Sequence, residues 1–277
     1  MATSPKTILL TGSTDGIGLA TATRLAALGH HLLLHGRDRA KVAHTQRAVR
    51  ATNGGGAVST FVADLSRLSD VEALAAAVKE GHPHLDVLIN NAGVFRTPEP
   101  VTSDGLDTRF VVNTISPYLL TRLLLPLLGP TDRVINLSSA AQAPVDLRAL
   151  AGKETLSDGA AYAQSKLALT MWSRHLATTL ERGPVMVAVN PGSLLATKMV
   201  KEGYGIDGND IGIGADILVR AAVGTDFAEA SGTYYDNDAG RFAAPHPDAL
   251  DPELNLALTD QIDAIIATHV QNATPPS

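Results

Sequence analysis

The sequence contains no cysteine, which excludes a disulfide framework, a thiolate metal site and a cysteine nucleophile. A chain without cysteine suits a reducing compartment, so we expect a cytoplasmic location. Aromatic residues account for only 4% of the 277 residues, and the core is therefore expected to consist of alanine, leucine, valine and isoleucine. Basic residues are not in excess, because the net charge is −6, and nucleic acid is not an expected partner.

Long apolar runs are also missing. The most apolar stretch, residues 118–128, contains Arg122 and Pro126 and is shorter than the roughly 20 residues that span a membrane. We therefore expect a buried helix there and no membrane span. The nine histidines show none of the spacings typical of metal ligands, so no metal site is expected. Residues 236–240 resemble the start of a calcium loop, but Pro247 stands where that loop needs a glutamate, and a plain turn is expected.

What the sequence does contain is an alternation of short apolar runs and longer helix-like segments. Strands are predicted at residues 7–11, 31–34, 58–62, 87–89, 134–137 and 185–189, and helices at residues 16–28, 39–51, 71–78, 104–128 and 160–181. Ser69 is expected to cap the helix at 71–78. Because the strands are apolar on both faces, we predict an α/β fold, a doubly wound, mostly parallel, Rossmann-like sheet with helices on both faces. Residues 1–277 are expected to form one dinucleotide-binding domain, with a mobile glycine-rich loop at 201–214 and a frayed tail at 273–277.

A glycine-rich loop follows the first predicted strand and opens the first predicted helix, with Gly12, Gly16 and Gly18. Glycine lets backbone N–H groups come close to an anion, and the helix N-terminus adds a partial positive charge. The loop is therefore predicted to bind the diphosphate of a dinucleotide rather than to be only an ordinary tight turn. No Gly-Lys-Ser/Thr follows, which excludes a P-loop.

The residues after the second predicted strand bear on which nicotinamide cofactor binds. An acidic residue there bonds the ribose 2′-hydroxyl of NAD, whereas an arginine accommodates the 2′-phosphate of NADP. Gly36 occupies the acid position and Arg37 follows it. NADP(H) is therefore favoured, while Asp38, which is also expected to cap the next helix, keeps NAD(H) open.

Two groups of side chains are suited to catalysis. Tyr162 and Lys166 stand four residues apart in a predicted helix and share a face. An ammonium beside a phenol lowers the pKa of the phenol and makes it a usable acid and base. Ser138 and Ser139 follow the fifth predicted strand, at the edge where an open parallel sheet binds its ligand. Singly, a tyrosine–lysine pair is common by chance, and strand-end serines often only cap the strand.

Taken together, the motifs resemble the single-domain members of the short-chain dehydrogenase/reductase family over nearly the whole chain. The matching motifs, in the family's order, are Thr11–Gly18, Asp64-Leu65, Asn90–Gly93, Asn113, Ser138-Ser139 and Tyr162 with Lys166. An insertion at residues 142–157 and the run from Tyr162 to Ala168 resemble the retinol-dehydrogenase-like branch.

The resemblance implies a role for each matching residue. Tyr162 would be the general acid and base, Lys166 would lower the pKa of Tyr162 and hold the nicotinamide ribose, Ser139 would bind the substrate oxygen, and Asn113 would anchor a water in the proton relay. The implied cofactor contacts, Tyr162 and Lys166 included, are Gly12, Ser13, Thr14, Gly16, Ile17, Gly18, Arg37, Asp64, Leu65, Asn91, Ala92, Gly93, Pro191, Gly192 and Thr197.

Two departures from the family's pattern are visible. The run from Pro191 to Thr197 is one residue longer than the family's Pro-Gly-x-x-x-Thr, which weakens Thr197 as a cofactor contact. Ser139 and Tyr162 are 23 residues apart, and the extra residues 142–157 are expected to form a solvated excursion beside the site. A substrate lid is expected at about 193–214, where Leu194, Leu195, Met199, Val200 and Tyr204 favour an uncharged or weakly polar carbonyl compound.

The expected function is therefore an NADP(H)-dependent oxidoreductase that interconverts a carbonyl compound and its alcohol. A sugar-nucleotide epimerase or dehydratase is disfavoured, because the chain leaves little room for a substrate domain. A non-catalytic nicotinamide-nucleotide sensor or interaction protein of the same fold is the alternative, and the intact set of four catalytic residue types argues against it. A homodimer or homotetramer is expected through the helices at 104–128 and 160–181, although burial of these helices within one chain would use the same residues.

Overall fold

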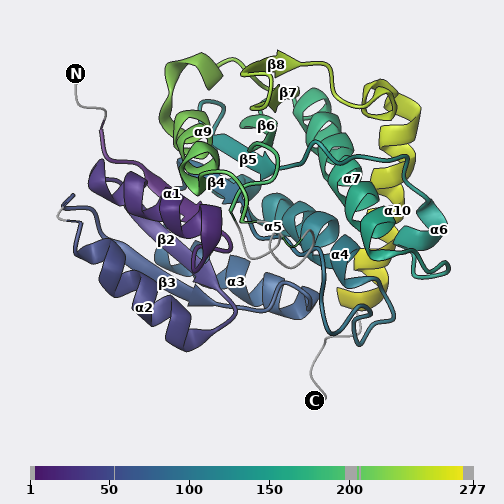
Figure 1. The fold of residues 1–277 in the computed structure, drawn as a ribbon, viewed down its shortest axis with the longest axis horizontal. Coiled ribbons are helices and arrows are strands. Elements are labelled where there is room, and N and C mark those ends of the chain that lie inside the picture. The colour runs from purple at the N-terminus through teal and green to yellow at the C-terminus, as the bar shows by residue number, and fades with distance from the viewer. Residues whose placement is uncertain (1–3, 53, 197–204, 206, 271–277) are drawn as a thin grey trace.

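The computed structural model contains a single eight-stranded sheet among residues 4–52, 54–196, 205 and 207–270, which are the residues that the structure describes (Figure 1). The strands lie in the order β3-β2-β1-β4-β5-β6-β7-β8, and all neighbours pair in parallel except the edge strand β8, which is antiparallel to β7. Their bounds are β1 Thr7–Leu10, β2 His31–Gly36, β3 Val58–Val62, β4 Val87–Asn90, β5 Arg133–Leu137, β6 Val185–Asn190, β7 Thr233–Asp236 and β8 Arg241–Ala243.

Both faces of the sheet are buried, as the apolar strand sequences predict. In β1, Leu9 packs into the cluster on one face, whereas Ile8 and Leu10 pack into the cluster on the other. Helices α1 (Gly16–Ala27), α2 (Arg39–Arg50) and α9 (Ile211–Val223) cover one face. Helices α3 (Leu68–Gly81), α5 (Ser116–Leu124), α7 (Asp158–Thr179) and α10 (Pro252–Val270) cover the other. The predicted doubly wound α/β fold is confirmed.

The helix predicted at residues 104–128 is wrong as a single continuous helix. It consists of a short helix α4 (Thr108–Phe110), a π-helical turn η1 (Val111–Ile115), helix α5 and a 3-10 turn η2 (Leu125–Leu127). Pro117 supplies a physical reason, since it lacks the N–H that an α-helix would direct to the carbonyl of Asn113, and in such a helix its ring would clash with that carbonyl. The π turn places this discontinuity at Asn113, a residue singled out by the sequence.

Three smaller predictions also need correction. Helix α3 starts at Leu68 after the N-cap Arg67, so Ser69 lies inside the helix and does not cap it. The excursion at 142–157 is not only solvated, because it contains helix α6 (Leu147–Leu150), of which Leu150 is fully buried. The glycine-rich loop predicted at 201–214 includes residues 201–204 and 206, outside the described residues, and its last four residues already belong to α9.

The apolar stretch around α5 is part of the protein core. Residues Thr108–Leu127 are long and apolar enough to cross a membrane by length and composition, yet 72% of their apolar window is buried inside the protein. Helix α10 lies against α7 (Figure 1), and its Leu258, Ile262 and Ile265 share a buried cluster with Trp172 of α7. A face of the helix pair predicted to mediate association is thus covered within the chain.

Candidate active site

A cavity of about 1000 Å³ opens at the carboxyl ends of the central strands. It lies where the strand order reverses, because β1 has β2 on one side and β4 on the other, and open parallel sheets bind their ligands at such a point. Most residues singled out by the sequence line this cavity: Gly12, Thr14, Gly16, Ile17, Gly18, Arg37, Asp64, Leu65, Asn91, Ala92, Gly93, Ser139, Tyr162, Lys166, Pro191 and Gly192.

The loop after β1 forms a cradle made of backbone. Gly12 and Gly16 have φ angles of 65° and 54°, a region that glycine adopts readily. A Cβ atom at Gly18 would lie 2.1 Å from the carbonyl oxygen of Gly12, so no side chain fits there. The side-chain amide of Asn91 donates to the carbonyls of Thr11 and Gly12 at 2.9 and 3.0 Å and joins the loop to the end of β4. These residues fit the diphosphate of a dinucleotide, which would lie at the N-terminus of α1.

Ser13, a predicted cofactor contact, does not line this cavity. It is fully buried, and both its backbone N–H and its hydroxyl donate to the carbonyl of His35, at 2.9 and 3.0 Å. Both of its donors are therefore directed into the protein. Thr197, another predicted contact, lies outside the described residues, as do Met199, Val200 and Tyr204 of the predicted lid.

His35 holds the cradle in place through hydrogen bonds of its ring, and no sequence motif predicted this role. Its Nδ1 accepts from the N–H of Gly12 at 3.2 Å, and its Nε2 lies 3.1 Å from the carbonyl of Ala63. The first contact requires Nδ1 without a proton, so Nε2 carries the proton and donates to Ala63. Burial lowers the pKa of His35 to about 4, and the ring is neutral at physiological pH.

The two serines after β5 have different surroundings. Ser138 is buried, and its hydroxyl lies 2.7 Å from that of Thr170 on α7. Ser139 lines the cavity, and its carbonyl accepts from the amide of Gln142 at 2.9 Å and from the hydroxyl of Tyr234 at 3.3 Å. The backbone of Ser139 is thereby fixed from the insertion and from β7, and Ser139 is the serine available to a ligand.

Helix α7 brings Tyr162 and Lys166 into the cavity on one face. The Lys166 Nζ donates to the carbonyl of Leu137 at 2.6 Å and lies 5.8 Å from the centre of the Tyr162 ring. Burial lowers the pKa of Lys166 to about 8. The ring of Phe95 packs edge-on against that of Tyr162, with centroids 5.1 Å apart. The phenol and the ammonium therefore share a cavity whose walls restrict the tyrosine.

The side chain of Asn113, close to this pair, is hydrogen-bonded at both its oxygen and its nitrogen. Its Oδ1 accepts from the N–H of Val94 at 2.8 Å, while its Nδ2 donates to the carbonyl of Val94 and to the hydroxyl of Ser165, both at 2.9 Å. A Cβ atom at Gly93 would lie 3.4 Å from both Asn113 Oδ1 and Lys166 Nζ. The β4 loop, the π turn and α7 thus meet at Gly93.

A turn between β7 and β8 clamps the segment that follows β6. The carboxylate of Asp238 accepts from the N–H and the hydroxyl of Ser193, at 2.8 and 2.6 Å, and from the side chain of Asn190 at 2.9 Å. The side chain of Asn237 donates to the carbonyl of Pro191 at 2.9 Å. Although partial burial opposes it, hydrogen bonding from Ser193 and Asn190 lowers the pKa of Asp238. The sequence predicted a turn here but gave no sign of this clamp.

Comparison with known proteins identifies relatives of the chain. A family model described as short chain dehydrogenase matches residues 6–204. Retinol dehydrogenase 13 from Homo sapiens is 33% identical over 271 residues, which cover 90% of this chain and 81% of the relative. Polyprenol dehydrogenase from Homo sapiens is 36% identical over 176 residues, 61% of this chain and 53% of that protein.

A solved structure has the same fold. The short chain dehydrogenase from Burkholderia cenocepacia J2315 in complex with NADP superimposes with a TM-score of 0.68 and 26% sequence identity. The similarity covers 85% of this chain and 97% of that one.

The environment of His35 predicts a pH dependence of stability. Since its pKa falls from 6.5 to about 4 on folding, the unfolded chain binds the proton more readily, and stability is lost as the pH falls through this range. The free energy of unfolding should decrease by about 3 kcal/mol more in the wild type than in His35→Gln between pH 6.5 and 4. Urea denaturation at several pH values measures this difference. The exposed His44→Gln serves as control, and parallel curves for wild type and His35→Gln would contradict the assignment.

Because of this clamp, we expect the backbone amides of residues 190–196 to be protected from hydrogen exchange. In Asp238→Asn the charged acceptor of Ser193 is lost, and backbone amide exchange in this segment should accelerate about 5- to 10-fold. Hydrogen–deuterium exchange with mass spectrometry measures the change. Asp216→Asn, which removes an exposed partner of Arg24 on α9, is the matched control and should leave the segment unchanged. Equal rates in all three proteins would show that the clamp contributes nothing to order.

Proposed function

The chain belongs to the short-chain dehydrogenase family, and from this premise we propose that it is an NADP(H)-dependent oxidoreductase that interconverts a carbonyl compound and its alcohol. As a member of the family it is an oxidoreductase with an NAD(P)-binding Rossmann fold. The observation that carries the finer proposal is the meeting of Tyr162, Lys166 and Ser139 in the cavity that the glycine cradle opens. When bound, the nicotinamide ring supplies or accepts the hydride, and the protein supplies position and charge.

Tyr162 is proposed as the general acid in reduction and the general base in oxidation. In reduction its phenol O–H donates to the carbonyl oxygen of the substrate, while the Ser139 hydroxyl donates a second hydrogen bond to the same oxygen. An unperturbed phenol has a pKa of about 10, so the reverse direction needs help at neutral pH. The ammonium of Lys166 favours the phenolate because it lies 5.8 Å from the ring centre in a buried setting.

A proton route from Tyr162 to solvent is proposed to pass through Lys166 and a water at Asn113. Both N–H groups of the Asn113 side chain are used, by the Val94 carbonyl and the Ser165 hydroxyl, and its Oδ1 already accepts from the N–H of Val94. We assign the water to the Asn113 backbone carbonyl, because Pro117 cannot supply the N–H that an α-helix would direct to that oxygen. The π turn thus has a part in the proposed chemistry.

The substrate is proposed to be an apolar carbonyl compound or alcohol. The cavity that contains Tyr162 is also lined by Val94, Phe95, Val112, Leu194 and Leu195. Such walls favour apolar ligands fixed by a few polar groups, here Ser139 and Tyr162. Relatives named for retinol and polyprenol, both largely apolar alcohols, support this substrate class.

NADP(H) is proposed as the preferred cofactor. Gly36 cannot carry the acidic side chain that NAD-binding enzymes use, because a Cβ atom there would lie 2.6 Å from Thr14 and 2.9 Å from Val42. Arg37 and Lys41 line the same end of the cavity and offer two positive charges to a 2′-phosphate. The carboxylate of Asp38 accepts from the N–H of Lys41 at 2.9 Å and thus caps α2. The NADP complex of the Burkholderia relative supports the same choice.

The location, domain organisation and oligomeric state of the protein are proposed from the sequence. A cytoplasmic location, a single domain and association as a homodimer or homotetramer are proposals that rest on the sequence. The packing of α10 on α7 covers part of the face expected at the dimer interface, so a dimer through that face would have to include α10.

Replacement of Tyr162 tests the chemistry. Tyr162→Phe removes the proton donor while keeping the ring, so kcat should fall about 10²- to 10⁴-fold and the Kd of NADPH should change less than two-fold. Steady-state rates on a panel of aldehydes, ketones and alcohols, with cofactor fluorescence titrations, measure both. Tyr118→Phe, whose hydroxyl contacts Asp263 away from the cavity, is the control. Undiminished turnover in Tyr162→Phe would falsify the mechanism. NADPH binding without turnover of any panel member by the wild type would favour the non-catalytic alternative.

Replacement of Arg37 tests the cofactor preference. Arg37→Gln loses a charge-assisted contact to the 2′-phosphate, so the KM of NADPH should rise about 10- to 100-fold while the KM of NADH stays within two-fold. Arg39→Gln removes a neighbouring exposed charge that does not line the cavity and should change neither constant. If the wild type uses NADH as well as NADPH, or if both KM values rise equally, the assignment of Arg37 is wrong.

A further inference from the structure

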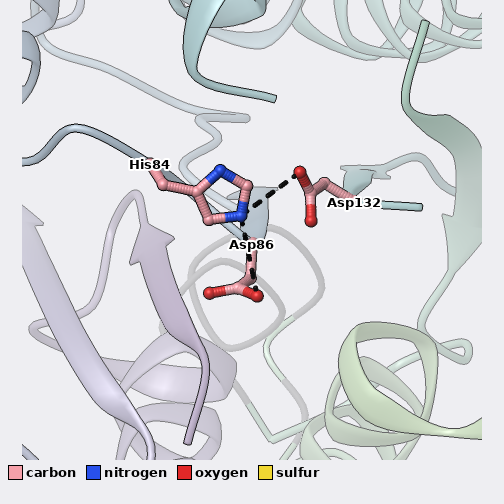
Figure 2. Close-up of side chains that lie close together, drawn as sticks. All are labelled: His84, Asp86 and Asp132. Atoms are coloured by element: carbon pink, nitrogen blue, oxygen red, sulfur yellow. Dashed lines mark ion pairs between the residues drawn. The ribbon is translucent and has the colours of Figure 1, made fainter. Parts of the chain in front are cut away.

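A cluster of His84, Asp86 and Asp132 lies at the edge of the sheet opposite the crevice (Figure 2). His84 and Asp86 precede β4, and Asp132 precedes β5. Parallel pairing of these strands, with Val87 opposite Arg133, brings the three side chains together although Asp132 is 46 residues beyond Asp86. One donor atom from each residue lies within 4.8 Å of the other two. Histidine spacing along the chain gave no sign of this set, because two of its members are aspartates and one comes from another strand.

The distances within the cluster are longer than those of a hydrogen-bonded ion pair. His84 Nε2 lies 3.5 Å from Asp132 Oδ2 and 3.9 Å from Asp86 Oδ1. A charge-assisted N–H···O bond would bring these atoms to about 2.7–2.9 Å. In a tetrahedral zinc site with bonds of about 2.0–2.2 Å, neighbouring ligand atoms stand roughly 3.3–3.5 Å apart. The separation of His84 and Asp132 matches this range, and the other ligand atoms, within 4.8 Å of one another, would have to move closer to share an ion.

The two carboxylates are held in place by the backbone. Asp86 Oδ2 accepts from the N–H of Thr7 at 2.7 Å, and Asp132 Oδ2 accepts from the N–H of Gly129 at 2.6 Å. Hydrogen bonds of this kind orient the ligands of metal sites. The Asp132 side chain is only 6% exposed, and no cationic side chain among the described residues donates a hydrogen bond to it. A buried carboxylate is costly without a close positive charge, which a metal ion would supply.

We propose that His84, Asp86 and Asp132 bind a zinc ion, with water as the fourth ligand. One imidazole nitrogen and two carboxylate oxygens form a donor set that zinc accepts, and the two carboxylates balance its charge. His84 is 56% exposed, so an ion reaches the site from solvent. The ion would join the beginnings of β4 and β5 and, through the bond of Asp86 to Thr7, that of β1. Its role is to stabilise the sheet, at the edge away from the proposed chemistry.

Substitution of Lys6 distinguishes a zinc site from an ion-pair network that holds no metal. Its Nζ lies 3.6 Å from Asp86 Oδ1, the oxygen that faces His84, and its charge repels a dication there. Lys6→Met should therefore increase the zinc affinity several-fold. In a network that holds no metal, the same substitution would remove an ion pair and leave zinc binding absent.

The experiment is titration of the metal-stripped protein with zinc chloride, by isothermal calorimetry and by thermal unfolding. We expect one zinc per chain and a rise in Tm of about 5 °C or more at a hundred times the Kd. His84→Gln should weaken binding at least ten-fold and abolish the Tm shift. His82→Gln, a change in the same turn, should behave as the wild type. Anomalous diffraction at the zinc edge would place the ion among the three side chains.

Several outcomes would overturn the proposal. Failure of the wild-type protein to bind zinc at concentrations below 100 micromolar would overturn it, because a site of three ligands binds well below that concentration. Equal affinity in wild type and His84→Gln would assign the zinc to other residues. An anomalous peak elsewhere, or a Lys6→Met variant with weaker binding, would contradict the geometry described. The proposed oxidoreductase activity does not depend on any of these results.

Discussion

The close approach of the loop after β1 to the segment after β4 is the contact on which the crevice depends. Side chains do not fit at this point, since a Cβ atom on Gly12 would lie 2.9 Å from the Cα of Ala92 and one on Gly18 would lie 2.6 Å from the Asn91 amide. The Asn91 amide and the neutral ring of His35 hold the loop from two sides, and both use hydrogen bonds to backbone. The shape offered to a diphosphate is therefore produced by the sheet itself, through residues whose side chains face inward rather than toward the ligand.

The second constraint is the lack of an N–H at Pro117, which coincides with the π turn at Asn113. The Asn113 side chain donates to the Ser165 hydroxyl, which in turn donates to the backbone carbonyl of Tyr162 at 2.7 Å. A break in one helix is thereby connected to the position of the tyrosine on another. The proposed proton donor is thus held by packing and hydrogen bonds between two helices on the same face of the sheet.

The sequence was sufficient to predict the alternating pattern, the first six strands and most residues that line the cavity. Periodicity and glycine spacing report local backbone preferences, and these elements are governed by such preferences. It was insufficient where tertiary contacts decide. The short strands β7 and β8 have no strong pattern, and the break at Asn113 depends on a single proline. His35 and Ser13 were missed or misplaced because their roles follow from burial, and the cluster at Asp132 arises only when β4 and β5 pair.

The turn between β7 and β8 has a consequence for how the chain is divided. The region shared with the family model ends at residue 204, and it contains every motif by which the crevice was found. Asp238 and Asn237, which hold Asn190, Pro191 and Ser193, lie more than thirty residues beyond it. A fragment or chimera cut at the end of that region would keep every motif residue and yet lose the support for one wall of the crevice. Motif content and structural completeness are therefore separate properties of this chain, and a swap of the residues after 204 would alter the site without touching a motif.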